Sequence, residues 1–395
     1  MVGGGMTGLS CAQKLAEGGL KVLLLEKKLC GGEASGKSSG FITPDSEIEL
    51  SSLISHHGPE KAKRIWNFVM SGVDLIRSNI ERYGIDCDYQ IQDSLFIANS
   101  KRGWRHVKHE HEARKALFYA SHLIEADDLT EIIGSKKYRG AVRYSDTFGF
   151  ISHRYCRALM KIFMAAGVKI YEKTPVTKIL ADGVETKKGR FYASQIIVCA
   201  DRFIPDLGHL KKEIYHIQTF IGISKPLSDA DVKKVFPGDP LMVWDSSMIY
   251  NYFRLTPDKR LILGGGHLLH TYSKKPLKNL DKIKRKLLRQ FSKNFPGISV
   301  ELKKTYSGML GVSRDLLPVM GEDKHMKNVW YVGAATGLPW AAALGKYAAE
   351  RITKNRTGFE EDFSWRRPFP LPRFLEFLVG KKISYALSHF IAKYL

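Results

Sequence analysis

Gly3-Gly4-Gly5-Met6-Thr7-Gly8 is the stretch of sequence that decides the fold. Residues 9–17 follow with apolar side chains on one helical face, and residues 22–25 form an apolar run typical of a buried parallel strand. The glycines let a turn approach a pyrophosphate, and the start of the next helix favours an anion. Glu26 ends the strand, where an acid accepts hydrogen bonds from a ribose. The pattern predicts a dinucleotide site, against the alternative of a chance glycine turn.

Length and composition indicate an ordinary globular protein. The chain has 395 residues, 44% hydrophobic and 26% charged, which is enough for two domains. No run of about 18 apolar residues is present, so no membrane-spanning helix is expected. The five cysteines are widely spaced and form no CxxC pair. We therefore expect no disulfide framework, no metal site and a reducing compartment, in a protein that is cytoplasmic or peripheral to a membrane.

The formal net charge of +22 favours anionic partners, such as a phosphate-bearing cofactor, a nucleic acid or an anionic membrane. Lysine and arginine are scattered along the chain, so a solvated basic surface is the alternative. No nucleic-acid-binding motif accompanies the charge, and we do not expect nucleic acid as a partner.

Further strand and helix patterns follow the opening motif. Residues 29–44 are a long loop rich in glycine and serine, and residues 59–83 are typical of a helix. A helix at 155–166 and strands at 168–172, 195–200, 249–255 and 260–264 are expected from their patterns. A late strand at 329–332 leads through a glycine turn at 333–337 into a helix that begins near Pro339.

Four segments together resemble the FAD-dependent D-amino-acid oxidase superfamily, which includes glycine, sarcosine and γ-glutamylputrescine oxidases: residues 3–26, 34–44, 149–179 and 308–350. The resemblance implies FAD as the cofactor and an α/β fold. A Rossmann-like FAD-binding domain is expected at 1–82, 149–211 and 306–370. A discontinuous second α+β substrate domain carrying an antiparallel sheet is expected at 83–148 and 212–305, with an amphipathic tail at 371–395.

The family's reaction implies a function. We expect oxidation of a C–N bond of a small amine or amino acid by hydride transfer to flavin, with O2 or a quinone as the electron acceptor. One alternative is a flavoenzyme that acts on a modified tRNA base. Others are a membrane-associated flavin dehydrogenase that passes electrons to quinone, and a binding protein without cofactor.

The resemblance also implies which residues contact the cofactor. They belong to the opening motif with its acid, to the second loop that crosses the pyrophosphate, to the adenine position and to two late glycine turns: Gly3, Gly5, Met6, Thr7, Gly8, Glu26, Lys27, Ala34, Ser35, Ser38, Gly40, Val176, Gly308, Gly337 and Leu338. The helix after the last turn is expected to point its N-terminus at the flavin, where it would stabilise negative charge.

Three residues are candidates for the catalytic face. Tyr250, Tyr252 and Arg254 alternate along one predicted strand and so share a face. They are expected to line the substrate pocket, with a half-exposed sheet surface as the alternative.

The chain departs from the family pattern at one segment, Tyr306–Gly311. Amino-acid oxidases of the family often have an arginine there that pairs with the substrate carboxylate. Here Leu310 cannot form that pair, and Arg314 is offset, which favours an amine substrate, for example one resembling γ-glutamylputrescine. No cysteine lies between Tyr306 and Gly321, so we expect non-covalent FAD.

The two ends of the chain give further expectations. A strand before Gly3 should have about 5–6 residues, but only Met1 and Val2 are present, so the hypothesis is that the natural chain starts upstream. Near the other end, one helical stripe is apolar: Ile383, Ala386, Leu387, Phe390, Ile391 and Leu395. This stripe, within residues 383–395, is expected either to dock onto the protein or to lie on a membrane.

Overall fold

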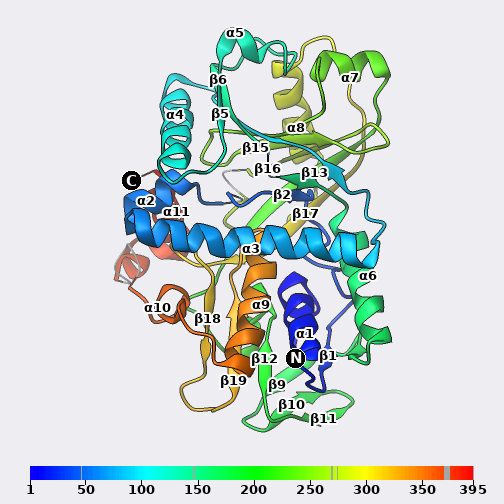
Figure 1. Cartoon of the computed structure of the whole chain (residues 1–395), viewed down its shortest axis with the longest axis vertical. Coiled ribbons are helices and arrows are strands. Elements are labelled where there is room, and N and C mark those ends of the chain that lie inside the picture. The colour runs from blue at the N-terminus through cyan, green and yellow to red at the C-terminus, as the bar shows by residue number, and fades with distance from the viewer. Residues whose placement is uncertain (46, 146, 268–269, 274, 369–373, 395) are drawn as a thin grey trace.

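A parallel sheet carries the predicted dinucleotide-binding unit (Figure 1). The computed structural model describes every residue except 46, 146, 268–269, 274, 369–373 and 395. Strand β1 pairs in parallel with β8, and β12 pairs in parallel with β19, whose other neighbour is the antiparallel β18. The bounds of these strands are β1 Leu23–Leu25, β8 Lys169–Tyr171, β12 Ile196–Val198, β18 Val319–Glu322 and β19 Val329–Gly333.

Met1 to Gly3 occupy the place of the first strand, between β1 and β12. Val2 forms parallel bridges to both strands. Its amide donates a hydrogen bond to the Ile197 carbonyl at 2.9 Å, and the Leu25 amide donates to the Met1 carbonyl at 2.9 Å. The short segment therefore joins the two strand pairs into one sheet and leads directly into the glycine turn.

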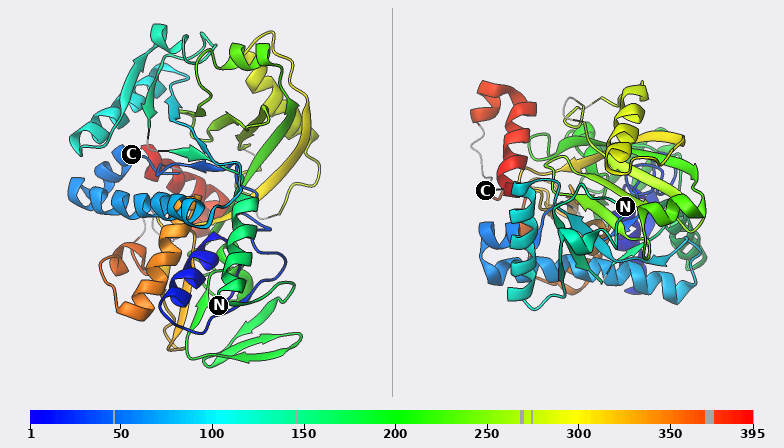
Figure 2. Two further views of the ribbon diagram at one scale, coloured as in Figure 1. Left: turned by 45° about the vertical axis from the view of Figure 1, so that its right-hand side comes forward. Right: turned by 90° about the horizontal axis from the view of Figure 1, so that it is seen from above.

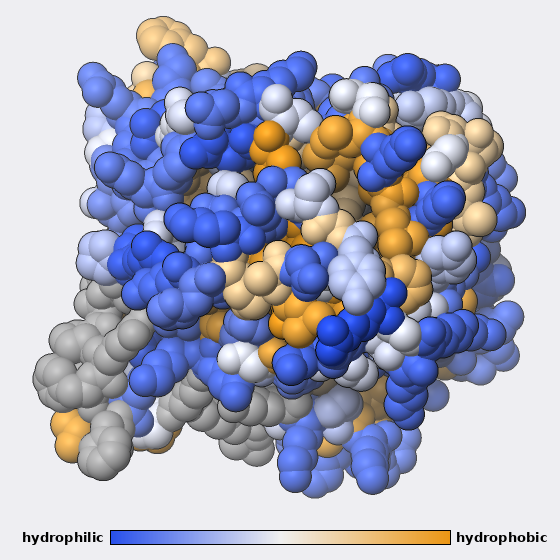
Figure 3. Space-filling model, turned by 90° about the horizontal axis from the view of Figure 1, so that it is seen from below, coloured by the Kyte–Doolittle hydropathy of each residue, from blue (hydrophilic) through white to orange (hydrophobic). Residues whose placement is uncertain are grey.

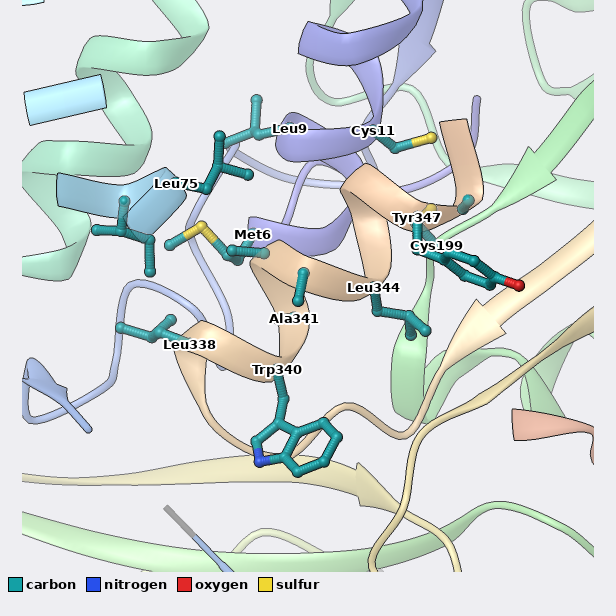
Figure 4. Close-up of a cluster of buried hydrophobic side chains, with 14 of the residues drawn as sticks. Met6, Leu9, Cys11, Leu75, Cys199, Leu338, Trp340, Ala341, Leu344 and Tyr347 are labelled. Atoms are coloured by element: carbon teal, nitrogen blue, oxygen red, sulfur yellow. The ribbon is translucent and has the colours of Figure 1, made fainter. Parts of the chain in front are cut away.

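Helix α1 (Met6–Glu17) packs against α9 (Leu338–Lys354), which in turn packs against the long helix α3 (Pro59–Tyr83). Figure 4 shows Met6 of α1 beside Ala341 of α9, and Leu9 of α1 beside Leu75 of α3, and all four are buried. The predicted helix at 59–83 is confirmed. Proline at its first position suits a helix start, and Gly84 ends it in the left-handed region, at φ 57°.

The second large element is an eight-stranded sheet in the order β17-β13-β16-β15-β14-β4-β6-β5. All neighbours are antiparallel except β14 and β4, so the expected antiparallel sheet is in fact mixed. The α/β fold class is confirmed. The strands are β4 Ser94–Ile97, β5 His122–Glu125, β6 Gly140–Tyr144, β13 Tyr215–Pro226, β14 Met242–Asp245, β15 Asn251–Leu255, β16 Arg260–Gly265 and β17 Leu302–Val312.

Helices flank this sheet at the end away from the N-terminus, and smaller elements connect the two sheets (Figures 1 and 2). The flanking helices are α4 Lys101–Ala116, α5 Ala126–Leu129, α7 Asp229–Val235 and α8 Asp281–Asn294. The connecting and peripheral elements are β2 Phe41–Ile42, β3 Gln90–Ile91, β7 Phe148–Gly149, β9 Val176–Ile179, β10 Gly183–Thr186, β11 Gly189–Tyr192, α2 Leu50–His57, α6 Ser152–Ala165, α10 Glu360–Phe363 and the 3-10 turns at 201–203 and 205–207.

The division into domains at the expected boundaries remains a proposal. The eight-stranded sheet takes its strands from residues 94–144 and 215–312. Strand β17 runs through the expected boundary between residues 305 and 306, where the substrate domain was predicted to end and the FAD-binding domain to resume. Because β17 also reaches the cavities described below, one strand serves both parts of the molecule.

The C-terminal helix α11 (Phe374–Tyr394) is broken at Gly380, whose φ is 78°. It docks through Ser384, Tyr385 and Ser388, which are buried, whereas Ile383 and Leu387 are 55% and 45% exposed. The predicted apolar stripe is therefore divided: Ala386 packs on the protein and Phe390 and Ile391 are half-buried, whereas Ile383 and Leu387 face outward. Leu395, its last member, lies outside the described residues. In the part of the chain that the structure describes, no helix is long and apolar enough to cross a membrane.

The surface near β9–β11 is mostly hydrophilic, with apolar side chains showing between the polar ones (Figure 3). Exposed apolar residues on the strands and turns of the N-terminal half include Leu20, Leu29 and Tyr171. Singly exposed apolar residues are usual on soluble surfaces and need no special function.

Candidate functional site

Two adjoining cavities lie where the parallel sheet meets the eight-stranded sheet. We name the larger, of about 400 Å³, the glycine-loop cavity, because Gly3 and Gly5 line it. We name the smaller, of about 150 Å³, the acidic cavity, after the carboxylates in its wall. The two share a set of lining residues and so form one continuous site: Ala34, Ser35, Leu310, Ala335 and Ala341.

The opening motif builds the glycine-loop cavity. Helix α1 begins directly after Gly5, which has no side chain to cap it, and Met6 and Thr7 of its first turn line the cavity. A Cβ on Gly8 would lie 1.9 Å from the Gly3 carbonyl oxygen, so only glycine lets the helix start so close to the turn. Nine of the predicted cofactor residues line this cavity: Gly3, Gly5, Met6, Thr7, Glu26, Lys27, Ala34, Ser35 and Val176.

Glu26 is held at the end of β1 by backbone amides. Its carboxylate accepts hydrogen bonds from the amides of Gly4 and Lys28, both at 2.7 Å. The second loop reaches the same place, because the Met6 amide donates to Ser35 Oγ at 2.9 Å. The motif and the second loop therefore form one polar cradle.

Asp201 lines the same cavity, and the sequence reasoning missed it. Its carboxylate accepts hydrogen bonds from the amides of Gly311 (2.8 Å) and Ala334 (3.0 Å), and so ties β17 to the end of β19. Burial raises the pKa of Asp201, and its backbone donors oppose that rise. One signal was present, since Asp201 follows the strand at 195–200 just as Glu26 follows its strand.

The acidic cavity contains the other predicted positions. Ser38, Gly308, Gly337 and Leu338 line it, as do Ala34 and Ser35 of the shared wall. Gly337 begins α9 at φ 101°, which favours glycine, and Leu338 and Ala341 of that helix's first turns face the cavity. The N-terminus of α9 thus opens into the site.

Of the three predicted catalytic residues, Tyr250 and Tyr252 line the acidic cavity and Arg254 does not. The Arg254 guanidinium is buried and donates to the carbonyls of Ser39 and Phe150, both at 2.8 Å. Burial lowers its pKa to about 10. Arg254 therefore holds the second loop from behind the cavity wall.

Gly40, also predicted to contact cofactor, shapes the same loop without lining either cavity. It has a φ of 78°, and a Cβ there would lie 1.8 Å from the Phe150 carbonyl oxygen. Its function in the structure is to let the loop turn beneath Arg254.

Three carboxylates in the wall of the acidic cavity were also missed: Asp45, Glu47 and Glu49. They follow β2 at every second position, and this period of two was the signal that could have identified them. The Tyr250 hydroxyl donates to Glu47 at 3.0 Å. Burial raises the pKa of Asp45 to about 7, while the nearby Arg114 opposes the rise.

Leu310, which stands where other members of the family often have an arginine, lies in the wall of the site. Leu310 lines both cavities and presents an apolar side chain there. Arg314 is buried elsewhere. Its guanidinium donates to the Tyr215 hydroxyl at 2.7 Å and pairs with Glu376 of α11.

Comparisons with known proteins agree with this geometry. A family model described as FAD dependent oxidoreductase matches residues 1–351. The chain is 30% identical over 274 residues to a probable oxidoreductase, OrdL, of Haemophilus influenzae. The matched region covers 67% of this chain and 63% of that protein, which is less than two thirds of the relative's length. It is 28% identical over 389 residues to the gamma-glutamylputrescine oxidoreductase of Escherichia coli, covering 94% of this chain and 87% of that protein.

Solved structures show the same fold. Glycine oxidase from Geobacillus kaustophilus aligns with a TM-score of 0.79 at 18% identity, over 93% of this chain and 98% of that one. L-Proline dehydrogenase from P. horikoshii aligns with a TM-score of 0.77 at 18% identity, over 92% and 95% of the two chains.

Proposed function

This chain belongs to the family of FAD-dependent oxidoreductases, and from this premise we propose that it oxidises a C–N bond of a small amine. The observation that carries the proposal is the wall of the acidic cavity. It presents Asp45, Glu47 and Glu49, and it has Leu310 where a carboxylate-binding arginine was expected. Carboxylates attract an alkylammonium ion and repel the carboxylate of an amino acid.

The residues of the glycine-loop cavity fit FAD. The close approach at Gly8 leaves room for a pyrophosphate beside the start of α1, where Thr7 lines the cavity. Glu26 lies at the strand end where a ribose hydroxyl is held, and Val176 lines the cavity at the expected adenine position. We infer that these residues hold the nucleotide half, and that Ser38, Gly308 and Gly337 border the ring.

Bound FAD supplies an acceptor for a hydride, which carries two electrons and a proton. We propose that the carbon beside the amine nitrogen gives up this hydride while the nitrogen loses a proton. The single C–N bond becomes a C=N bond, and water then releases an aldehyde and ammonium. The chain's own contribution is to orient the amine and exclude water, through Trp244, Tyr252 and Leu310 of the cavity wall.

Product analysis tests this proposal. Purified protein loaded with FAD would be incubated with primary amines and with glycine or alanine, and the carbonyl product and ammonia would be quantified. We expect release of both from an amine and none from the amino acids. Gamma-glutamylputrescine, the compound in the name of the Escherichia coli relative, belongs in the panel. Oxidation of amino acids alone would contradict the proposal.

The electron acceptor belongs to the same proposal, with O2 or a quinone as candidates. One observation favours a membrane-bound acceptor: Leu378, Ile383 and Leu387 of α11 are exposed. We propose that this outer face contacts anionic lipid. Sedimentation with anionic vesicles tests the contact, with Ile383→Ser and Leu387→Ser expected to weaken it. Ile91→Ser, at an exposed apolar residue of β3, is the matched control. Equal sedimentation of all variants would refute the contact.

A further inference from the structure

An arginine in the wall of the glycine-loop cavity has a buried hydrogen-bond donor without an acceptor. Arg202 lines the cavity from the 3-10 turn at 201–203. Its Nε is buried, and no described residue accepts a hydrogen bond from it. Asp201, the acid beside it, accepts instead from the backbone amides of Gly311 and Ala334. Leaving a buried N–H of a charged group without an acceptor is costly, so this donor calls for an acceptor on a ligand.

Neighbouring side chains hold the guanidinium in place, and none of those described here accepts a hydrogen bond from it. The guanidinium carbon of Arg202 lies 3.9 Å from the centre of the Phe203 ring, as a cation does on an aromatic face. A carboxylate oxygen of Glu33 is 4.0 Å from a terminal nitrogen of Arg202, which is longer than a hydrogen bond. Glu33 accepts instead from Lys28 and, at 3.1 Å, from Lys37. Arg202 therefore keeps its hydrogen-bonding capacity for the cavity.

Two close approaches place Arg202 beside the polar cradle. The chain after β12 abuts the glycine turn, because a Cβ on Gly3 would lie 2.5 Å from the Cys199 carbonyl oxygen. On the other side, Glu33 is two residues before Ser35, whose hydroxyl accepts a hydrogen bond from the first amide of α1. Arg202 thus lies between the glycine turn and the second loop, where the FAD pyrophosphate is proposed to lie. Guanidinium groups bind phosphate oxygens through paired N–H groups.

The other cations that line the glycine-loop cavity are less suited to this task. Lys28 pairs with Glu33, and Lys27 is exposed, with its Nζ 4.3 Å from the centre of the Phe203 ring. The side chain of Arg202 is only 17% exposed, against 59% for Lys28. Water and salt screen exposed charges much more than buried ones. Of the three cations, Arg202 therefore has the strongest attraction for an anion in the cavity.

We propose that Arg202 binds the pyrophosphate of FAD, with its buried Nε–H and a terminal N–H donating to phosphate oxygens. The Phe203 ring keeps the guanidinium in this orientation. The glycine motif at residues 3–8 contains no cation, so Arg202 supplies the positive charge beside it. This inference rests on the placement of FAD in the proposed function, and it adds a residue outside the predicted cofactor set.

Release of FAD from the holoenzyme tests the inference without turnover. Flavin fluorescence after stepwise dilution gives the Kd for FAD in the wild type and its variants. Arg202→Leu should weaken binding by about 10- to 100-fold, as for lost hydrogen bonds to a charged group. Arg202→Lys keeps the charge but not the paired N–H groups, so its Kd should be intermediate. Arg190→Leu is the matched control, because Arg190 is exposed on β11 and pairs with Glu185 at the surface.

Displacement of FAD by fragments of its nucleotide half identifies the group that Arg202 binds. ADP carries a pyrophosphate and adenosine carries none. In the wild type, we expect ADP to bind more tightly than adenosine when both Kd values are obtained from displacement. Arg202→Leu should reduce the ratio of the two Kd values by about 10-fold, because it removes the contact with phosphate. Its Kd for adenosine should stay unchanged. Arg202→Lys should change the ratio in the same direction, and it decides the matter if Arg202→Leu does not fold.

The outcomes separate this inference from the proposed amine oxidation. The inference is overturned if Arg202→Leu holds FAD as tightly as Arg190→Leu. It is also overturned if the Arg202 variants weaken ADP and adenosine equally, since the guanidinium would then only pack on Phe203. If the binding results are as expected but no amine reduces the flavin, amine oxidation fails and the assignment of Arg202 stands.

Discussion

The close approach of Gly8 to the Gly3 carbonyl oxygen predicts a defined effect of the substitution Gly8→Ala. A Cβ added to Gly8 would lie 1.9 Å from the Gly3 carbonyl oxygen and 3.1 Å from its carbon. Both are backbone atoms, so no side chain can move aside. The start of α1 would have to shift by about an ångström to reach an ordinary contact distance, and overpacking of this kind costs about 1–3 kcal/mol.

Helix α1 cannot move away freely, because its other side packs on α9. Met6 lies against that helix, and a Cβ on Gly345 of α9 would already come within 2.2 Å of the Thr7 carbonyl oxygen. The displacement must therefore be taken up at the turn that cradles the pyrophosphate. Gly8→Ala is expected to weaken FAD binding by about 10-fold or more, since 1.4 kcal/mol corresponds to a factor of ten.

Flavin absorbance per mole of purified protein and titration of the apoprotein with FAD measure this effect. Gly238→Ala is the matched control, because nothing lies within 4 Å of a Cβ there and its φ is not positive. The reasoning would be refuted if Gly8→Ala retained FAD and melted at the same temperature as Gly238→Ala.

Three other substitutions have defined outcomes. Glu26→Gln is expected to weaken FAD binding by about 10-fold in a fluorescence titration, because a charged acceptor of the Gly4 and Lys28 amides is lost. Arg254→Met should lower the melting temperature and the flavin content together, since the guanidinium holds the second loop; an unchanged flavin content would contradict this. Burial raises the pKa of Asp45 from 3.8 to about 7, so the folded state binds this proton more tightly than the unfolded state. The stability that this proton gives is present below about pH 4 and is lost as the pH rises to about 7. Asp45→Asn should flatten the melting temperature across that window, and an unaltered pH profile would count against a buried acid there.

The geometry of the glycine-loop cavity could be predicted from the sequence because its residues are close along the chain. Gly3, Gly5 and Gly8 specify the turn and the close helix start, and Glu26 follows one strand later. Short-range patterns of this kind determine local geometry directly. The comparisons then confirmed the family and its FAD cofactor.

The acidic cavity was harder to predict, because its walls come from distant segments. Asp45 and Arg114 are 69 residues apart, and Tyr250 meets Glu47 across 203 residues. Arg254 shares a strand with Tyr252, but its long side chain ends on the carbonyls behind the cavity. Alternation along a strand gives the face of a residue, but it does not give the depth that a side chain reaches.

The C-terminal helix α11 shows a second limit of prediction from the sequence. The apolar stripe was expected either to dock onto the protein or to lie on a membrane, and the most buried residues of α11 are instead Ser384, Tyr385 and Ser388. The Tyr385 ring stacks on Tyr215 at 5.0 Å, so an aromatic contact that the stripe does not include holds the helix to the protein. Burial depends on what the rest of the fold presents, which the local pattern of the helix does not contain.

The central claim is that this chain binds FAD and oxidises an amine, and one spectrum tests it most directly. The absorption of the purified, FAD-loaded protein would be recorded without oxygen, before and after addition of putrescine, butylamine, glycine, proline and transfer RNA. The account predicts that the oxidised flavin band bleaches with putrescine and stays unchanged with the amino acids. Bleaching by an amino acid or transfer RNA alone, or by none of them, would contradict it.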